Sequence, residues 1–386
     1  MKKFLSLFLS LTLLLALTAC KAAEAASGAQ QEQRTVTAPT DDATFVYQPE
    51  DPTVTPAGGE TIALVTGVSG TESGADAMLW QGVQTFASAY GYTATTQTAE
   101  GDSSADAETA LRTAAESGAK LVICRGDAAA TALYRIQENY PDVHYLLFDD
   151  EPHNDDYSAY KTANLVHCVL FQEEQAGYLA GYAAVIDGHT SLGFVGAREI
   201  PGIVRYGTGF LQGAEAAAEQ QGETVNLKFW FADTYDENDA VTQRMADWYN
   251  GGVSLIFVSG GTLYKGAAQA AEQTGGKVMA GDTNVTALSD SVLASAVKCY
   301  NAAVQRQLYE FFTAGSWSTQ NAGQTERVGI TNAEVALESD TSWRLDSFTL
   351  DDYRSLYEDL RTSVKRVDAY ADMETLPDTP NVTVSR

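Results

Sequence analysis

Short apolar runs alternate with amphipathic stretches of helical period from Thr61 onward, and this alternation limits the chain to a small set of folds. The run 61–68 has the composition of a buried strand, and in 75–90 the apolar residues recur at helical spacing. The cycle then repeats, with strands expected at 93–98, 120–125, 143–149 and 164–171. Strands that alternate with helices in this way form parallel sheets covered by helices. This part of the chain is therefore predicted to be an open α/β lobe.

A second series of the same kind predicts a second lobe. A helix is expected at 173–186, and the elements after it are strands at 192–197, 225–231, 255–259 and 278–282 and helices at 202–221, 238–250 and 263–274. Two lobes of about 110 residues each agree with the usual size of domains better than one very large core. The predicted fold class is therefore α/β, with two open parallel-sheet lobes joined by a hinge.

The chain is expected to pass between the lobes more than once. A further strand at 292–297 and a helix at 298–314 are predicted to return it to the first lobe. The predicted first lobe comprises 60–168 and about 285–322, and the second comprises 169–284 and about 323–375. The predicted hinges are the connections near 169–172, 283–291 and 321–326, because lobe closure would bend the chain there.

The amino terminus has the features of an export signal. Lys2 and Lys3 precede an apolar run, 4–17, that is too short to span a bilayer, and the run closes on Leu17-Thr18-Ala19-Cys20. This ending resembles the bacterial lipobox, so residues 1–19 are predicted to be a signal peptide and Cys20 to carry a lipid. The alternative is a plain signal peptide with a chance cysteine. Lipid with palmitate-type acyl chains would hold the protein on the outer face of the cell membrane.

Residues 20–58 are predicted to be a flexible, lipidated tether. They are rich in Ala, Gln, Thr, Pro and Asp and have no hydrophobic period. Beyond the signal run, no stretch reaches the roughly 18 consecutive apolar residues of a spanning helix. The lipid is therefore the only membrane attachment that the sequence predicts.

Net charge excludes one class of partner. The chain has 51 acidic and 24 basic residues and a net charge of −27, which becomes −29 when Lys2 and Lys3 are removed with the signal peptide. A body of this charge is repelled by phosphate backbones, so nucleic acid is not expected as a partner.

The cysteines that follow Cys20 lie in apolar segments, and we expect them to be free buried thiols: Cys124, Cys168 and Cys299.

Catalytic signatures do not occur in this sequence. It has no GxxxxGK[ST] phosphate loop, no HExxH, no GxSxG and no GxGxxG after a strand. The four histidines share no metal-ligand spacing, and the adjacent His167 and Cys168 would point to opposite faces of a strand. The sequence therefore predicts no enzyme, no cofactor and no metal site.

Polar residues and glycines stand where the predicted strands end. In open α/β lobes this edge faces the ligand, and an Asp there can accept hydrogen bonds from two neighbouring hydroxyls. An isolated Asp at such a place is more often a turn or helix cap. Gly261, in Gly260-Gly261-Thr262, could offer backbone amides to a ligand oxygen, although a tight turn alone would also need these glycines. The residues concerned are Gly67, Arg125, Asp149, Ala197, Asp233, Gly260, Gly261 and Asp282.

Several segments together resemble the basic membrane protein family, the solute-binding lipoproteins of ABC transporters with the type I periplasmic-binding fold. The segments are Phe171-Gln-Glu-Glu-Gln-Ala-Gly-Tyr-Leu-Ala-Gly-Tyr182, Gly193-Phe-Val-Gly196, Ile200-Pro201, Gly209-Phe210, Ile256-Phe-Val-Ser-Gly-Gly-Thr262, Ala280-Gly-Asp-Thr283 and Ser295-Ala-Val-Lys298. Their order and spacing match from about residue 60 to 312. The resemblance implies a receptor that closes on a nucleoside, most often a purine nucleoside, and delivers it to a permease.

The resemblance also implies roles for particular residues. Asp282 would bind the ribose hydroxyls and Lys298 would reach the sugar. Asp76 and Asp149 align with a polar residue and an acid of the first lobe, and Tyr235 aligns with the aromatic residue that stacks on the base.

Four positions depart from the family pattern. Gly67 stands where the family has an Asp, and Ala75 where it has the Phe that forms the other half of the base sandwich. Arg125 and Arg198 add positive charge near the expected site. Each could bind an anionic group of a ligand or form salt bridges with nearby carboxylates.

Three functions remain open at this point. The first is a transport receptor for a nucleoside or a similar small polar solute. The second is a signalling or regulatory lipoprotein that uses the same ligand-binding fold. The third is an enzyme such as a nucleoside hydrolase, which the wide spacing of the aspartates disfavours because a metal would need them clustered.

Overall fold

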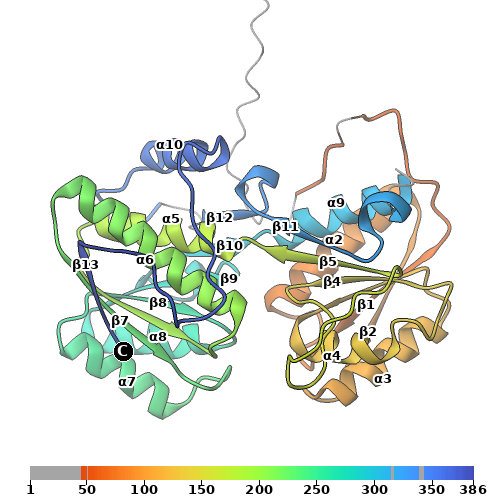
Figure 1. Cartoon of the computed structure of the whole chain (residues 1–386), viewed down its shortest axis with the longest axis horizontal. Helices are drawn as coiled ribbons and strands as arrows, with labels where there is room; N and C mark the ends of the chain where they lie inside the picture. Colours follow the sequence, from red (N-terminus) through yellow and green to blue (C-terminus); the bar gives the residue numbers. More distant parts are fainter. Residues whose placement is uncertain (1–44, 50, 314–316, 339–342) are drawn as a thin grey trace, which may run out of the picture. The chain divides into compact units, whose positions relative to one another are not determined.

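The structure is a computed structural model that describes residues 45–49, 51–313, 317–338 and 343–386. Two sheets with flanking helices form two α/β lobes (Figure 1), which confirms the predicted fold class. The predicted signal peptide 1–19, the predicted lipidation site Cys20 and the first part of the predicted tether lie outside the described residues. Within the described part, no helix combines the length and the apolar character that a membrane crossing requires.

The first sheet consists of six parallel strands in the order β2-β1-β3-β4-β5-β11. The strands are β1 (Thr61–Thr66), β2 (Thr93–Thr98), β3 (Leu121–Arg125), β4 (His144–Phe148), β5 (Val166–Phe171) and β11 (Gln324–Val328). Successive residues of β1 belong to two different cores, because side chains alternate across a strand. Ile62 and Leu64 pack in one core and Ala63 and Val65 in the other.

Four helices cover the two faces of this sheet. They are α2 (Gly74–Tyr90), α3 (Ser104–Glu116), α4 (Gly126–Ile136) and α9 (Tyr300–Thr313). Helices α2 and α9 pack together over one face, and α3 and α4 pack together over the other. The sheet is therefore buried on both sides, as the apolar runs of β3 and β4 predict.

The second sheet repeats the arrangement of the first. Its order is β13-β7-β6-β8-β9-β10-β12, and of its described strands only β12 runs antiparallel to its neighbour. The strands are β6 (Ser191–Gly196), β7 (Val225–Phe231), β8 (Leu255–Ser259), β9 (Lys277–Asp282), β10 (Val292–Lys298), β12 (Val335–Glu338) and β13 (Val382–Ser385). In both sheets the strand that comes first in the sequence lies between the second and the third. Sheets of this order bind ligands beyond the carboxyl ends of their strands.

The helices of the second lobe are α5 (Glu173–Ile186), α6 (Pro201–Gln221), α7 (Asp239–Asn250), α8 (Leu263–Thr274) and α10 (Leu350–Arg361). Short helical turns are η1 (Thr286–Leu288), η2 (Trp317–Asn321) and η3 (Ile330–Asn332). Helices α5 and α6 pack so closely that their backbones are in contact. A β-carbon on Gly177 would lie 2.2 Å from the carbonyl oxygen of Tyr206, so no larger residue fits there.

The chain crosses between the sheets at 171–173, 298–300 and 328–330, and two of these places differ from the expected boundaries. The predicted boundaries place β10 in the first lobe, within 285–322, but it pairs with β9 and β12 in the second sheet. They place β11 in the second lobe, within 323–375, but it pairs with β5 in the first sheet. All seven residues of β10 are buried, so the sequence indicates a central strand but not the sheet to which it belongs.

The first and third crossings lie against each other. The backbone amide of Gln172 donates to the carbonyl of Val328 at 2.7 Å, and the amide of Ile330 donates to Oε1 of Gln175 at 2.8 Å. The predicted hinge at 283–291 does not connect the lobes, because the chain stays in the second sheet until Lys298.

Part of the predicted tether contacts the first lobe. The amide of Tyr47 donates to Oε1 of Gln305 at 3.0 Å, and Nε2 of Gln305 donates to the carbonyl of Phe45 at 2.9 Å. The hydroxyl of Tyr309 donates to the carbonyl of Asp51 at 3.2 Å. The stretch 45–51 is thus attached to α9 at its described residues, whereas the sequence predicts a flexible segment up to residue 58.

Candidate functional site

Two aspartates occupy equivalent places at the carboxyl ends of the two sheets. Asp149 follows β4, the fourth strand of the first sheet, and Asp282 ends β9, the fourth strand of the second. Both have left-handed backbone conformations, with φ values of 70° and 90°. Among residues other than glycine, Asp is one of the few that tolerate this region. The sequence predicts both residues as ligand contacts, and the structure brings them together.

The hydroxyl of Tyr300 joins the two aspartates. It lies 2.7 Å from Oδ2 of Asp149 and 2.8 Å from Oδ1 of Asp282. A hydroxyl has one hydrogen, so it donates to one of these carboxylates at a time. Tyr300 begins α9, directly after the second crossing, and sequence reasoning missed it because the crossing was expected earlier in the chain.

Lys298 is the charged centre of the site. Its Nζ lies 2.9 Å from Oδ1 of Asp149, 3.1 Å from Oε1 of Glu173 and 3.5 Å from Oδ1 of Asp282. Burial acts to lower the pKa of this ammonium, but the carboxylates around it outweigh burial and hold its pKa well above the usual value. Lys298 therefore stays charged and links the two sheets.

The acids beside Lys298 respond in the opposite sense. Burial opposes ionisation of Asp149, but Lys298 and Arg125 together hold the pKa of its carboxyl below the usual value. Burial likewise opposes ionisation of Glu173, and Lys298 and Arg205 lower its pKa. Lys298, Asp149 and Glu173 thus favour one another's charged forms inside the protein.

Arg125 forms salt bridges with two of the predicted site residues. Its Nε lies 3.0 Å from Oδ1 of Asp76, and its Nη1 lies 3.3 Å from Oδ2 of Asp149. The other oxygen of Asp76 accepts the backbone amide of Gly67 at 2.9 Å. Of the two roles that the sequence leaves open for Arg125, the structure shows the salt bridge, and both oxygens of Asp76 already have partners in the protein.

Two further residues of the site come from helix packing. The close approach of α5 and α6 places Nε of Arg205 at 2.7 Å from Oε2 of Glu173. Glu173 belongs to the Phe171-Gln-Glu-Glu segment, and the sequence gives the signal for it only through the family resemblance. The neighbouring Glu174 accepts two hydrogen bonds from Nη2 of Arg327 on β11, at 3.0 and 2.8 Å. Glu173 therefore stabilises the site, and Glu174 links the start of α5 to β11 next to the first and third crossings.

Tyr206 positions the end of β9. Its buried hydroxyl donates to the carbonyl of Ala296 at 3.0 Å and accepts the amide of Asp282 at 3.1 Å. The structure shows that it is buried and acts through the backbone of Asp282.

Tyr235 and Gly261 belong to one loop cluster of the second lobe. Tyr235 is 37% exposed, and the guanidinium carbon of Arg198 lies 5.3 Å from the centre of its ring. Gly261 has a φ of 57°, and a β-carbon there would lie 2.0 Å from the carbonyl oxygen of Tyr235. That carbonyl accepts the amide of Thr262 at 2.7 Å. Gly261 therefore allows the Tyr235 loop to pack closely, and the amide of Thr262 is already used.

A surface pocket of about 600 Å³ lies elsewhere, at the amino ends of β1 and β3, where Glu60, Lys120 and Tyr140 line it. None of the charged residues described above borders it. The order of strands in an α/β sheet favours the opposite edge for ligands, so we place the candidate site at Asp149, Asp282 and Lys298.

The family profile described as "ABC transporter substrate-binding protein PnrA-like" matches residues 60–359. The chain belongs to this family. PnrA-like proteins are extracytoplasmic solute-binding components of ABC transporters, which implies a small-molecule ligand and a permease partner. The resemblance drawn from the sequence is thereby confirmed at the level of the family.

Solved structures show that the PnrA-like chain shares its fold with other two-lobed proteins. An ABC transporter solute-binding protein from Conexibacter woesei is 18% identical with a TM-score of 0.63, and the match covers 81% of this chain and 100% of that one. One from Aeropyrum pernix is 18% identical with a TM-score of 0.60, over 79% and 86% of the chains. A transcriptional activator of the comK gene from Bacillus halodurans is 17% identical with a TM-score of 0.62, over 79% and 97%. A search of curated proteins finds no match.

Proposed function

We propose that this chain is the lipid-anchored receptor of an ABC transporter and that it binds a nucleoside, with purine nucleosides preferred, at the carboxyl end of β9. The observation that carries the proposal is Asp282. Its side chain is 33% exposed, whereas those of Asp149 and Lys298 beside it are 11% and 7% exposed. Asp282 is thus the acid of the network that a solute can reach.

The bonding of Asp282 supports a role in binding hydroxyls. Its Oδ1 shares the Tyr300 hydroxyl with Asp149. Asp149 is bonded to Arg125 and lies 2.9 Å from Nζ of Lys298, whereas Asp282 lies 3.5 Å from that atom. A vicinal diol can donate two hydrogen bonds to one carboxylate, and hydrogen bonds to charged groups contribute about 1.5–3 kcal/mol each. A ribose at Asp282 would therefore satisfy the acid that the protein satisfies least.

Tyr235 supports the choice of a ligand with a flat ring. Its exposed ring could stack on a base, and such stacking contributes about 1–3 kcal/mol. Ala75 provides no second ring, so we expect recognition of the sugar to be stricter than recognition of the base. Asp76, Asp149 and Arg125 would then shape the first-lobe side through their salt bridges.

Calorimetry of the full chain with nucleosides tests this proposal. We expect purine nucleosides to bind more tightly than pyrimidine nucleosides, and free bases to bind weakly because they lack the diol. Asp282→Asn should weaken nucleoside binding by about 10- to 100-fold, since one charge-assisted hydrogen bond or more is lost. The matched control is Asp290→Asn, which changes a fully exposed acid in the loop before β10.

Two results would contradict the proposal. If no nucleoside binds or raises the melting temperature, the ligand class is wrong. If Asp282→Asn binds nucleosides as tightly as Asp290→Asn does, the site is wrong. Nucleoside binding without any effect of gene deletion on nucleoside uptake would favour the signalling or regulatory role instead.

The anchor is tested separately. We infer that residues 1–19 are removed and that Cys20 is acylated, because the lipobox-like Leu17-Thr18-Ala19-Cys20 follows the apolar run. Cys20→Ser should release the protein from the membrane fraction and abolish incorporation of labelled palmitate. A membrane fraction that keeps the Cys20→Ser protein unchanged would exclude this mode of attachment.

A further inference from the structure

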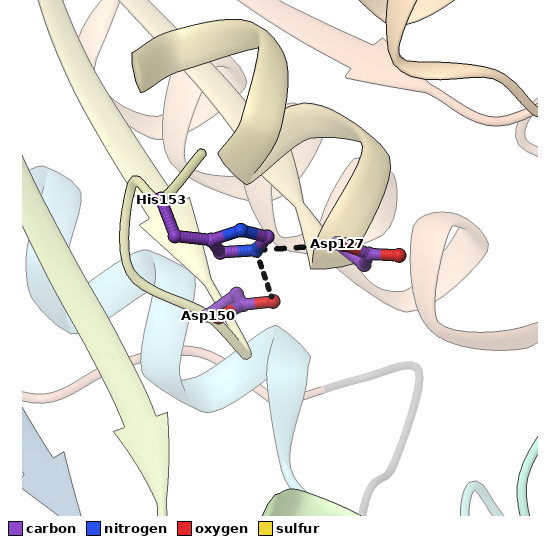
Figure 2. Close-up of side chains that lie close together, drawn as sticks. All are labelled: Asp127, Asp150 and His153. Atoms are coloured by element: carbon purple, nitrogen blue, oxygen red, sulfur yellow. Dashed lines mark ion pairs between the residues drawn. The ribbon is translucent and has the colours of Figure 1, made fainter. Parts of the chain in front are cut away.

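One group of side chains beside the candidate site has no part in the proposed function. Asp127 lies in the first turn of α4, Asp150 directly follows Asp149, and His153 lies in the loop after β4 (Figure 2). One ligand atom from each of the three lies within 4.8 Å of the others. We propose that Asp127, Asp150 and His153 bind a divalent transition-metal ion, with zinc preferred.

The orientation of His153 is the first argument. Its Nδ1 lies 2.8 Å from the carbonyl oxygen of Asn154, and a carbonyl can only accept, so Nδ1 carries a hydrogen. In the neutral ring Nε2 then has a free lone pair. This atom is buried, has no hydrogen-bond partner, and points between the two carboxylates (Figure 2). Histidines that bind metals are commonly held in this way through their other nitrogen.

The spacing of the three groups is the second argument. Nε2 lies 3.4 Å from Oδ1 of Asp127 and 3.5 Å from Oδ2 of Asp150. These separations exceed the usual 2.7–3.2 Å of a hydrogen bond. They are close to the roughly 3.3 Å between neighbouring ligands around a tetrahedral zinc, whose bonds to nitrogen and oxygen are about 2.0–2.1 Å.

The surroundings hold each ligand in place. The hydroxyl of Tyr157 donates to Oδ1 of Asp127 at 2.8 Å, and the amide of Glu151 donates to Oδ1 of Asp150 at 2.8 Å. The ring of Tyr157 also stacks on that of His153, with centres 4.0 Å apart and an interplanar angle of 16°. The imidazole therefore has little freedom to turn away from the carboxylates.

The donor set points to the class of ion. One imidazole with two carboxylates suits zinc and its neighbours in the first transition row, whereas Ca²⁺ and Mg²⁺ prefer oxygen ligands alone. The side chain of Asp127 is 49% exposed, so solvent or a ligand could supply a fourth ligand atom. Such an ion would tie α4 to the loop after β4, next to the predicted ligand contact Asp149.

Titration of the metal-stripped full chain with zinc chloride tests the proposal. Calorimetry should show one zinc per chain, and zinc in excess should raise Tm by at least about 3 °C. His153→Gln should weaken zinc binding by at least about 100-fold, because it removes a ligand atom. The matched control is His189→Gln, whose Nδ1 contacts Oγ of Ser254 in the second lobe, and it should bind zinc as the unchanged chain does.

A second measurement does not depend on the variant folding. X-ray absorption of the zinc-loaded, unchanged chain should show one imidazole among oxygen ligands. Absence of stoichiometric zinc binding would overturn the proposal, and so would equal affinity in His153→Gln and His189→Gln. Either result would leave a protonated His153, paired with the two carboxylates, as the account of the cluster.

Discussion

Asp149 and Asp282 stand at the ends of equivalent strands, have the same left-handed backbone and share one tyrosine hydroxyl, yet their surroundings differ. The side chain of Asp149 is 11% exposed and has Lys298 and Arg125 as cationic partners. The side chain of Asp282 is 33% exposed, and its nearest cation, Lys298, lies at 3.5 Å. Asp149 thus serves the packing of the protein, whereas Asp282, at the same position in the other lobe, is accessible to solvent.

This difference teaches that position at the end of a strand does not by itself make an acid a ligand contact. In the first lobe, Arg125 at the end of β3 neutralises both Asp76 and Asp149. At the equivalent place in the second lobe, β8 ends in Ser259, which brings no charge. Arg125 therefore gives Asp149 a cationic partner that Asp282 lacks.

Replacing Lys298 should have the largest effect on stability. Lys298→Ala removes the cation that Asp149, Glu173 and Asp282 share, and the loss of one member of a buried ion network costs about 3–5 kcal/mol. Urea unfolding would measure it. Lys161→Ala, which removes an exposed salt bridge with Glu138, is the control, and we expect less than about 1 kcal/mol there. Equal losses in the two variants would refute the buried network.

Replacing the two aspartates one at a time tests the comparison directly. Asp149→Asn should lower the free energy of unfolding by about 1–3 kcal/mol, because it leaves charged donors poorly matched in a buried site. Asp282→Asn should lower it by less than about 1 kcal/mol, since its side chain is more exposed. The same urea unfolding series would decide, and a larger loss for Asp282→Asn would reverse the roles assigned here.

The smallest effect concerns acid stability at β11. Burial raises the pKa of Glu326, but the nearby ring of His167, whose Nε2 lies 3.7 Å from Oε2, and the charge of Arg306 lower it more, to about 2 from the ordinary 4.5. A depressed pKa stabilises the fold above the ordinary value, and this contribution disappears as the pH falls from 4.5 towards 2. Because the side chain is 32% exposed, we expect only about 1 kcal/mol.

Glu326→Gln should therefore lose about 1 kcal/mol at neutral pH, and its stability should fall less steeply with acid than that of the unchanged chain. Denaturant unfolding at several pH values between about 5 and 3 would check this. Glu138→Gln, an exposed acid, is the control. Parallel curves for Glu326→Gln and the unchanged chain would show that Glu326 is not the group responsible.

Most of the scaffold could be predicted from the sequence, because strands buried on both faces and amphipathic helices have distinct hydrophobic periods. Helix α5 has the predicted bounds, and β7 and β8 do as well. The sheet that receives β10 could not be predicted, since a strand buried on both faces fits either sheet. Because of this ambiguity the second crossing was predicted too early in the chain, and Tyr300 was not recognised as a site residue.

The candidate site was predictable where strand ends or a family motif marked it. Asp149, Asp282 and Arg125 stand where predicted strands end, and Lys298 is marked by the family resemblance; the structure brings Asp282 and Lys298 within 3.5 Å. The group of Asp127, Asp150 and His153 has no regular spacing, because its members come from a helix start, a strand end and a loop. Only the folded chain brings their side chains together.

The attachment of Phe45 and Tyr47 to α9 has a mechanical consequence. Both residues are bonded to Gln305, which lies five residues after Tyr300 on that helix, or about 7.5 Å along its axis. Any pull exerted on the chain before Phe45 would enter the lobe through this helix, whose first residue holds both aspartates. A pull on the chain before Phe45 and a ligand at the two aspartates would then both act on helix α9.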